Sequence, residues 1–160
     1  MFKIAIIMGS KSDSETVKQT ADILREFQVG FDAKILSAHR TPKELVKHIE
    51  SLEQKGVKVI IAAAGGSAAL AGVIAAHTTL PVIGIPIETK SLKGIDSLLS
   101  TAQMPPGIPV ACMSIGDWGA RNAAIYALEI LALSDKEIKL KLLSYKKQMA
   151  RKIKETKIKL

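Results

Sequence analysis

The chain has 160 residues, of which 48% are hydrophobic, and a formal net charge of +8. This length fits one domain with a substantial core, and no apolar run is long enough to span a bilayer. The N-terminal run Phe2–Met8 lacks the basic start and cleavage site of a signal peptide. A single cysteine, Cys112, excludes an internal disulfide and suits a reducing compartment. We therefore expect a cytoplasmic protein without a membrane partner.

Short apolar runs alternate with amphipathic patterns along the chain. The strand-like runs are Phe2–Met8, Phe31–Leu36, Val57–Ala63, Val82–Ile85 and Val110–Met113. The helical patterns are Ser14–Phe27, Pro42–Gln54, Ala68–His77, Ile95–Ala102 and Ala120–Ala132. Such alternation implies βαβ units and a parallel sheet covered on both faces. The sequence predicts an α/β fold, a flavodoxin-like doubly wound three-layer sandwich with five parallel strands in the order 2-1-3-4-5.

Residues suited to capping stand before three helical segments. We expect Asp13 to cap the first helix and Thr41 to cap the second, with Pro42 at its first position and Glu44 completing a capping box. Ser134 is the predicted cap of a further helix at the C-terminus. These starts place the preceding loops at the carboxyl ends of strands, where ligands bind in open α/β sheets.

The positive charge is concentrated in that C-terminal helix. Residues 135–160 have a net charge of +7, whereas residues 1–134 have a net charge of +1. The helix also carries an apolar stripe at helical spacing, formed by Ile138, Leu142, Tyr145, Met149 and Ile153. We predict an α/β domain over residues 1–134 and an extended amphipathic helix over residues 135–160. The helix is expected to pack on the body or a neighbouring subunit, and not to bind nucleic acid, although its charge alone would permit that.

The loop after the first strand, Gly9-Ser10-Lys11-Ser12-Asp13, has the composition of an anion site. Gly9 permits a tight turn, Ser10 and Ser12 supply hydroxyls, and the following helix adds free N–H groups. Asp13 could accept hydrogen bonds from ribose hydroxyls, cap the helix, or do both. The loop lacks the glycines of a dinucleotide fingerprint and the Gly-Lys-Ser/Thr of a P-loop. Taken alone, it is equally compatible with a plain helix cap.

The loop after the second strand, Ser37-Ala38-His39-Arg40-Thr41-Pro42, is the most informative segment of the chain. A doubly wound sheet places it beside the first loop, so Arg40 can add charge-assisted bonds to a phosphate held by Ser10 and Ser37. A lone histidine is more often structural than catalytic. Its position beside a predicted phosphate site favours His39 as a general acid–base.

The stretch Ala62–Gly72 consists largely of small residues. Small side chains let the backbone approach a flat ligand closely, and Ser67 is expected to begin a helix whose N-terminus offers another anion site. Close packing of a helix on the sheet would favour the same composition, so both interpretations stay open here.

The remaining chemically active residues are scattered. His48 and His77 fall within or at the end of helical patterns, and Cys112 lies in an apolar run, so all three are predicted to be structural. No zinc motif, Cys/His cluster or nucleophile–base pair is present. We therefore expect no metal and no cofactor.

Four motifs together resemble one family in their order and spacing. They are Gly9-Ser10-Lys11-Ser12-Asp13, Ser37-Ala38-His39-Arg40-Thr41-Pro42, Ala64-Gly65-Gly66 and Gln103-Met104-Pro105. The family is the PurE family of purine biosynthesis, the class I N5-carboxyaminoimidazole ribonucleotide mutases. The similarity runs from about Phe2 to Ala132, and the hexapeptide at 37–42 is its most specific part.

The resemblance implies an isomerase whose small-molecule substrate carries a ribose 5-phosphate and an aminoimidazole ring. By the family pattern, Ser10, Ser37 and Arg40 hold the phosphate, Asp13 binds ribose hydroxyls, and segment 65–70 encloses the base and the carboxyl group. The implied substrate-binding residues are Ser10, Ser12, Asp13, Ser37, Ala38, Arg40, Gly65, Gly66, Ser67 and Leu70. The implied catalytic residue is His39.

In the implied reaction, the N5-carbamate releases CO2 inside a closed pocket, and ring carbon C4 attacks it. His39 moves the proton that C4 loses. No cofactor is needed, because the aminoimidazole is an electron-rich enamine and the protein supplies positioning, CO2 retention and a proton shuttle. The family also implies a homo-octamer in which C-terminal helices reach neighbouring subunits.

One stretch departs from the family pattern, which usually reads Gly-Gly-Ala-Ala-His-Leu-Pro-Gly-Met after the third strand. Here Ala69 replaces the histidine, and His77 cannot substitute for it, because eight helical residues rise about 12 Å. Ser67 and the Ala69-Leu70 pair resemble the class II carboxylases, although those usually have Arg at Gly66 and Lys at Arg40. We predict the mutase, with direct CO2-dependent carboxylation of aminoimidazole ribonucleotide as the alternative.

Overall fold

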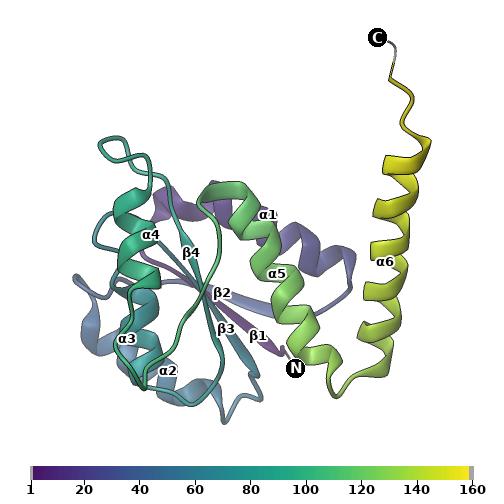
Figure 1. Ribbon diagram of the computed structural model, residues 1–160. Coiled ribbons are helices and arrows are strands. Elements are labelled where there is room, and N and C mark those ends of the chain that lie inside the picture. The colour runs from purple at the N-terminus through teal and green to yellow at the C-terminus, as the bar shows by residue number, and fades with distance from the viewer. Residues whose placement is uncertain (1, 159–160) are drawn as a thin grey trace.

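A parallel sheet between two layers of helices forms the body of the protein in the computed structural model, which describes residues 2–158 (Figure 1). The strands are β1 (Ile4–Met8), β2 (Phe31–Ile35), β3 (Val59–Ala64), β4 (Val82–Pro86) and β5 (Ala111–Cys112). They pair in parallel in the order β2-β1-β3-β4-β5. The predicted doubly wound α/β fold and its strand order are confirmed.

Helices cover both faces of the sheet. They are α1 (Ser14–Glu26), α2 (Pro42–Leu52), α3 (Leu70–Ala76), α4 (Ile95–Ala102), α5 (Gly116–Ala132) and α6 (Lys136–Glu155), with a short 3-10 helix η1 (Lys11–Asp13) before α1. The helices α1 and α5 pack on one face, and α2 and α3 on the other (Figure 1). The helix α5 starts four residues before the predicted Ala120. A Cβ at Gly119 would overlap Ser114 O, so glycine lets this first turn close against the preceding loop.

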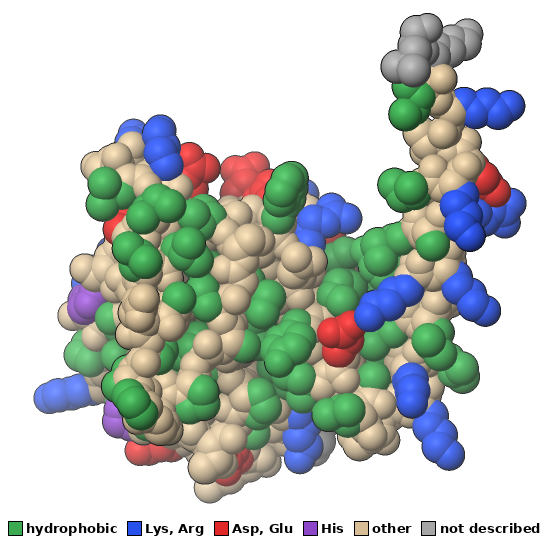
Figure 2. All heavy atoms as spheres, viewed as in Figure 1, with side chains coloured by type: hydrophobic (Ala, Val, Ile, Leu, Met, Phe, Trp, Pro, Cys, Tyr) green, Lys and Arg blue, Asp and Glu red, His purple; other side chains and the backbone are tan. Residues whose placement is uncertain are grey.

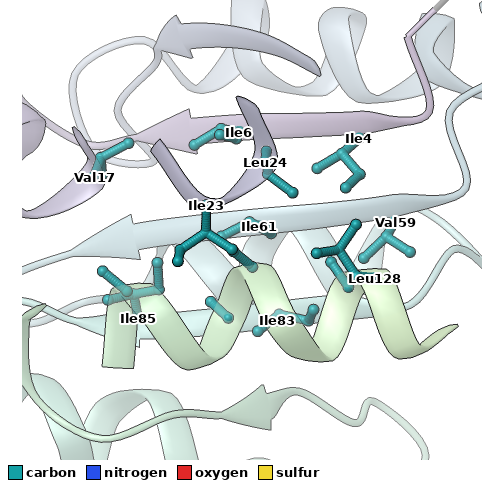
Figure 3. Packing of buried hydrophobic residues seen from close by; sticks show 14 of the residues in the cluster. Ile4, Ile6, Val17, Ile23, Leu24, Val59, Ile61, Ile83, Ile85 and Leu128 are labelled. Atoms are coloured by element: carbon teal, nitrogen blue, oxygen red, sulfur yellow. The ribbon is translucent and has the colours of Figure 1, made fainter. Parts of the chain in front are cut away.

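The central strands are buried on both faces, as the apolar runs predict. Residues alternate along each strand, so Ile4 and Ile6 of β1 face α1 and α5 (Figure 3), whereas Ala5 and Ile7 pack with residues of α2 and α3. Full burial of an isoleucine side chain contributes about 1.5–3 kcal/mol. The two edge strands are less buried: β2 is half-buried to exposed along its length, and β5 is half-buried.

Asp13 and Thr41 stand at the predicted N-cap positions of α1 and α2, but neither side chain makes the expected bond to its helix, because both bond within the loops instead. Asp13 makes no cap bond to α1, and its Oδ2 accepts from Ser10 N at 2.9 Å in a capping box around η1. Thr41 makes no cap bond to α2, which excludes the predicted box with Glu44. Its Oγ1 accepts from Ser37 N at 2.8 Å and lies 3.2 Å from Ser37 O. Both side chains therefore order the two loops.

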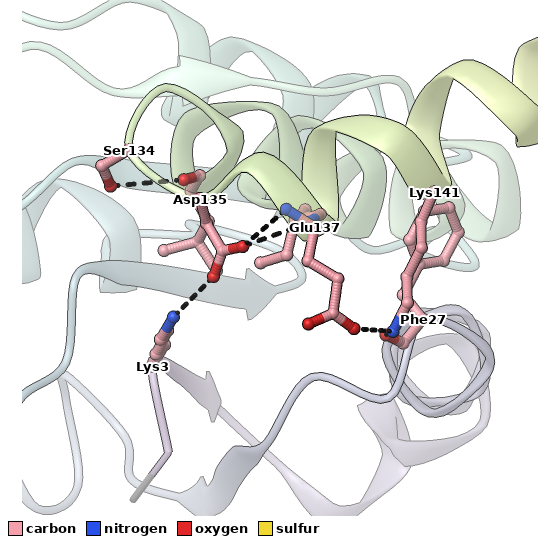
Figure 4. A network of polar contacts seen from close by, with 8 residues as sticks. Lys3, Phe27, Ser134, Asp135, Glu137 and Lys141 are labelled. Atoms are coloured by element: carbon pink, nitrogen blue, oxygen red, sulfur yellow. Dashed lines mark hydrogen bonds and ion pairs between the residues drawn. The ribbon is translucent and has the colours of Figure 1, made fainter.

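The predicted cap of the C-terminal helix is also wrong by one residue. Asp135, not Ser134, caps α6 by accepting hydrogen bonds from the N–H groups of Glu137 and Ile138 (Figure 4). Lys3 Nζ donates to Asp135 Oδ2 at 2.9 Å. That bond is the largest cause that lowers the pKa of Asp135. The start of α6 is therefore tied to the N-terminal strand.

The apolar stripe of α6 begins in the core and ends in solvent. Ile138 and Leu142 are buried in the α1–α5 cluster, and the Tyr145 ring packs edge-on against Phe27 with centroids 5.5 Å apart. Farther along, Met149 is 45% exposed and Ile153 is 78% exposed. The C-terminal half of the helix rises clear of the body (Figure 1), with basic side chains along it (Figure 2). Residues 159–160 of the predicted basic segment lie outside the described residues.

The pH dependence of stability should carry a contribution from His48, which is buried on α2. Burial lowers its pKa below the ordinary 6.5, and the charges of Lys34 and Lys55 lower it further, against an opposing effect of Asp32. At pH values between the lowered pKa and the ordinary 6.5, the unfolded chain binds more protons than the folded protein. The stabilising contribution of neutral His48 is therefore present above the ordinary pKa and is lost as pH falls toward the lowered pKa. Urea unfolding of His48→Gln should therefore show less loss of stability than the wild type between about pH 7 and about pH 5.

The matched control is His77→Gln, which changes an exposed histidine at the end of α3. It should keep the wild-type difference in unfolding free energy between the two pH values. Equal pH dependence in the wild type and His48→Gln would contradict the assignment.

Candidate active site

A cavity of about 470 Å³ lies at the carboxyl ends of β1, β2 and β3. Because β1 lies between β2 and β3, the loops after all three strands meet at this edge. The volume falls in the range of small-molecule sites, about 300–1,000 Å³. The lining residues are Gly9, Ser10, Ser12, Asp13, Ser37, Ala38, His39, Arg40, Ala64, Gly65, Ala68, Ala69 and Leu70.

The first loop holds two hydroxyls and a buried carboxyl group close together. The Ser12 hydroxyl lies 3.0 Å from Ser10 Oγ and 3.2 Å from Asp13 Oδ1, and it can donate its proton to either. Asp13 is buried, and that burial raises its pKa despite hydrogen bonds from Ser12 and from the Ser10 backbone and despite the charge of Arg40. A buried acceptor at a cavity wall is suited to bind hydroxyl groups of a ligand.

Arg40 links the second loop to the first. Its Nη2 donates to Gly9 O at 2.8 Å, and its Nε lies 3.3 Å from the buried Ser37 Oγ, which also accepts from Arg40 N at 3.2 Å. A guanidinium group has five N–H donors, and these contacts use only two of them. The side chain is thus held in place with charge and donors left to bind an anion.

His39 precedes Arg40 and lines the same cavity, with its side chain exposed to solvent. The residues around it provide hydrogen-bond donors, one cationic group and one buried carboxyl group. An imidazole that lines a ligand cavity is suited to act as a general acid–base on a bound molecule. The predicted phosphate-binding residues and the predicted acid–base therefore line the same cavity.

The third loop contributes a wall of small residues. Gly65, Ala68 and Leu70 line the cavity, whereas Gly66 and Ser67 do not, and their binding roles stay predictions. The expectation that Ser67 begins a helix is wrong, because α3 starts at Leu70. Gly66 has φ +65° and Ala68 has φ +36°, which prevents an earlier helix start. Left-handed backbone at a residue other than glycine costs on the order of 1–3 kcal/mol.

Four lining residues were not among the predicted site residues: Gly9, Ala64, Ala68 and Ala69. All four line the cavity with backbone atoms or a methyl group, so no chemically distinctive side chain marks them in the sequence. Their only signal is position, since each lies in or beside a loop at the carboxyl end of a strand.

Other features of residues 2–158 offer less chemistry. No group of three or more His, Cys, Asp or Glu side chains gathers there, and no helix is long and apolar enough to cross a membrane. Cys112 is half-buried, and burial raises its pKa, which disfavours the reactive thiolate. A hollow of about 530 Å³ at the opposite edge of the sheet is lined mainly by apolar residues.

An anion site beside a histidine, at this edge of a doubly wound sheet, is typical of an enzyme for a phosphorylated small molecule. The family model described as AIR carboxylase matches residues 3–152. The chain belongs to the AIR carboxylase family, which confirms the family predicted from the motifs.

Curated relatives and a solved structure agree with this assignment. An N5-carboxyaminoimidazole ribonucleotide mutase of Pyrococcus abyssi is 53% identical over 151 residues, which cover 94% of this chain and 86% of the relative. The enzyme of that name from Bacillus subtilis is 52% identical over 139 residues, 87% of this chain and 86% of the relative. Treponema denticola PurE has a similar structure, with a TM-score of 0.87, 33% identity, and coverage of 95% and 94% of the two chains.

Arg40→Gln should weaken binding of a phosphorylated sugar, because it removes the cation held beside Ser10 and Ser37. Charge-assisted hydrogen bonds contribute about 1.5–3 kcal/mol, so affinity should fall roughly 10- to 100-fold. Calorimetric titration with ribose 5-phosphate measures the change. Lys43→Gln removes an exposed cation outside the cavity and should leave the affinity within about twofold. An equal loss in both variants would contradict the assignment.

Proposed function

We propose that this protein is an N5-carboxyaminoimidazole ribonucleotide mutase of de novo purine (IMP) biosynthesis. One observation carries the proposal. The residues that the family pattern assigns to phosphate, ribose and proton transfer line a single cavity: Ser10, Asp13, Ser37, His39 and Arg40. The names of the similar proteins from Pyrococcus abyssi and Bacillus subtilis support it.

The geometry supports a division of binding roles. Arg40, with the hydroxyls of Ser10 and Ser37, holds the substrate phosphate between the first two loops, where the guanidinium group is already positioned. Asp13 accepts hydrogen bonds from the ribose hydroxyls. The small residues of segment 65–70 lie against the flat aminoimidazole ring and the carboxyl group. Substrate binding therefore spans all three loops.

The chemistry needs one group that carries a proton. Cleavage of the bond between N5 and the carboxyl carbon releases CO2, and N5 takes a proton from protonated His39. Ring carbon C4 then forms a bond to CO2 and loses its proton, which His39 accepts. The histidine ends as it began, and no electrons leave the substrate. Retention of CO2 in the cavity connects the two halves of the reaction.

The alternative is direct carboxylation of aminoimidazole ribonucleotide by free CO2. It is favoured by Ala69, which lines the cavity where a second histidine of the family pattern would stand, and by Ser67. Such an enzyme needs the same phosphate site and the same proton acceptor at C4. It differs only in the source of CO2, so the two functions are separated by their substrates.

The deciding experiment offers the enzyme either substrate. With N5-carboxyaminoimidazole ribonucleotide, we expect conversion to the 4-carboxy product without dependence on added CO2. With aminoimidazole ribonucleotide, we expect little turnover at low bicarbonate. His39→Asn should reduce the first activity by roughly 10²- to 10⁴-fold, because general acid–base catalysis contributes about that much. It should leave affinity for ribose 5-phosphate unchanged.

The control for that substitution is His77→Asn, an exposed histidine that does not line the cavity. Its rate should equal the wild-type rate. Turnover only at high CO2 would replace the mutase with the carboxylase. A wild-type rate in His39→Asn would remove the proton shuttle.

We infer that the protein acts in the cytoplasm as a homo-octamer. The support is an uncovered apolar surface: Met149 and Ile153 lie on the stripe of α6, and Leu99 and Trp118 are exposed on α4 and α5. An apolar stripe on a projecting helix is typical of an association surface. The single cysteine, Cys112, has no partner in the chain for a disulfide, which suits a reducing compartment.

Replacing the exposed end of the stripe should shift the assembly toward smaller species. We expect Met149→Gln combined with Ile153→Gln to lower the mass found by light scattering, because the apolar contact is lost. The control, Lys147→Gln with Lys154→Gln, replaces two lysines that lie off the stripe on the same stretch of helix and should leave the mass unchanged. An unchanged mass in the first variant, or an equal shift in both, would contradict a role for the stripe.

A further inference from the structure

The cavity wall at Gly65 rests on a segment that does not itself line the cavity. This segment, residues 87–94, connects β4 to α4. A Cβ built at Gly65 would lie 3.5 Å from Thr89 Cγ2 and 3.6 Å from Ile87 Cβ, which is ordinary van der Waals contact. The Thr89 methyl group and the Ile87 side chain therefore lie next to Gly65, at the distance that a methyl group on Gly65 would span.

Hydrogen bonds fix both supporting residues. Ile87 N donates to Ala64 O at 2.9 Å, and the fully buried Ser97 donates to Ile87 O at 2.7 Å. The Thr89 hydroxyl donates to the carboxylate of Asp96, at 2.9 Å from Oδ1 and 3.1 Å from Oδ2. Ile87 is thus held by the backbone of β3 and by α4, whereas the Thr89 hydroxyl donates to the side chain of Asp96.

The Thr89 hydroxyl also bonds within the turn that leads into α4. Gly94 N lies 3.4 Å from Thr89 Oγ1, and Gly94 has φ +88°. A Cβ there would come within 2.6 Å of Ile115 Cγ2 and 3.2 Å of Glu88 Cα. The turn is therefore closely packed, and the Thr89 hydroxyl bonds to Gly94 N and to Asp96 at the C-terminal end of the turn.

We propose that Thr89, held by Asp96, is a positioning residue that keeps the Gly65 wall closed over the reacting carboxyl group. This inference rests on the proposed function, in which CO2 must stay in the cavity between its release and its capture. A wall that moves outward lets CO2 escape and leaves aminoimidazole ribonucleotide as the product. The Thr89–Asp96 pair then affects which fraction of the bound substrate becomes the 4-carboxy product and which fraction becomes aminoimidazole ribonucleotide.

The first measurement is the ratio of these two products. Thr89→Val keeps the shape and a methyl group but removes the hydroxyl. In CO2-free single turnovers, corrected for loss without enzyme, it should raise the ratio of aminoimidazole ribonucleotide to 4-carboxy product by roughly fivefold, the equivalent of one net hydrogen bond. Asp96→Asn keeps an acceptor oxygen for the Thr89 hydroxyl, so its ratio should stay near that of the wild type. Affinity for ribose 5-phosphate should not change in either variant.

The second measurement does not depend on activity. Amide hydrogen exchange of the free protein should become faster in residues 64–70 of Thr89→Val, and stay unchanged in residues 9–13 and 37–41. Thr79→Val is the control, because Thr79 bonds to Glu53 outside the cavity. It should match the wild type in both measurements.

The outcomes separate the two proposals. A wild-type protein that does not convert the N5-carbamate would remove the proposed mutase, whatever the exchange data show. A wild type that does convert it, with an unchanged product ratio and unchanged exchange in Thr89→Val, would overturn the role of Thr89. Weaker binding of ribose 5-phosphate by Thr89→Val than by the wild type would also overturn this role, because it would indicate a general loss of structure.

Discussion

The active site depends on the parallel pairing that places β1 between β2 and β3. It brings residues 9–13, 37–41 and 64–70 to one edge of the sheet although they are far apart in the chain. The contact from Arg40 to Gly9 O then joins the first two loops, so the cation belongs to both. Parallel strands need long crossover connections, and here α1 and α2 supply them while covering opposite faces of the sheet.

Two residues at the site are in states that cost free energy. Asp13 is a carboxyl group whose pKa burial raises, and Ala68 has left-handed backbone. Both lie at the cavity, while most of the buried side chains on either side of the sheet are apolar. The stability supplied by strands β1, β3 and β4 therefore supports local costs at the edge where a ligand binds.

Much of this arrangement could be predicted from the sequence, because it follows from strong and local signals. The apolar runs that alternate with amphipathic patterns determine the strands and their order, and the hexapeptide at 37–42 indicates the family. The capping pattern misled at Asp13 and Thr41, since each side chain can bond to a helix end or to a loop. In the folded chain each bonds within its own loop, Asp13 to Ser10 N and Thr41 to Ser37 N. Thr89 has no signal in the sequence, because it comes close to Gly65 only in the folded chain.

The stripe on α6 has a thermodynamic consequence. Ile138 and Leu142 belong to the same cluster as the side chains of α1 and α5, while Ile153 on the same stripe is 78% exposed. A surface that covers the outer end binds only the folded helix, so its binding free energy adds to the stability of the subunit by mass action. The melting temperature of this protein would then rise with its own concentration. Folding and association would then be thermodynamically coupled.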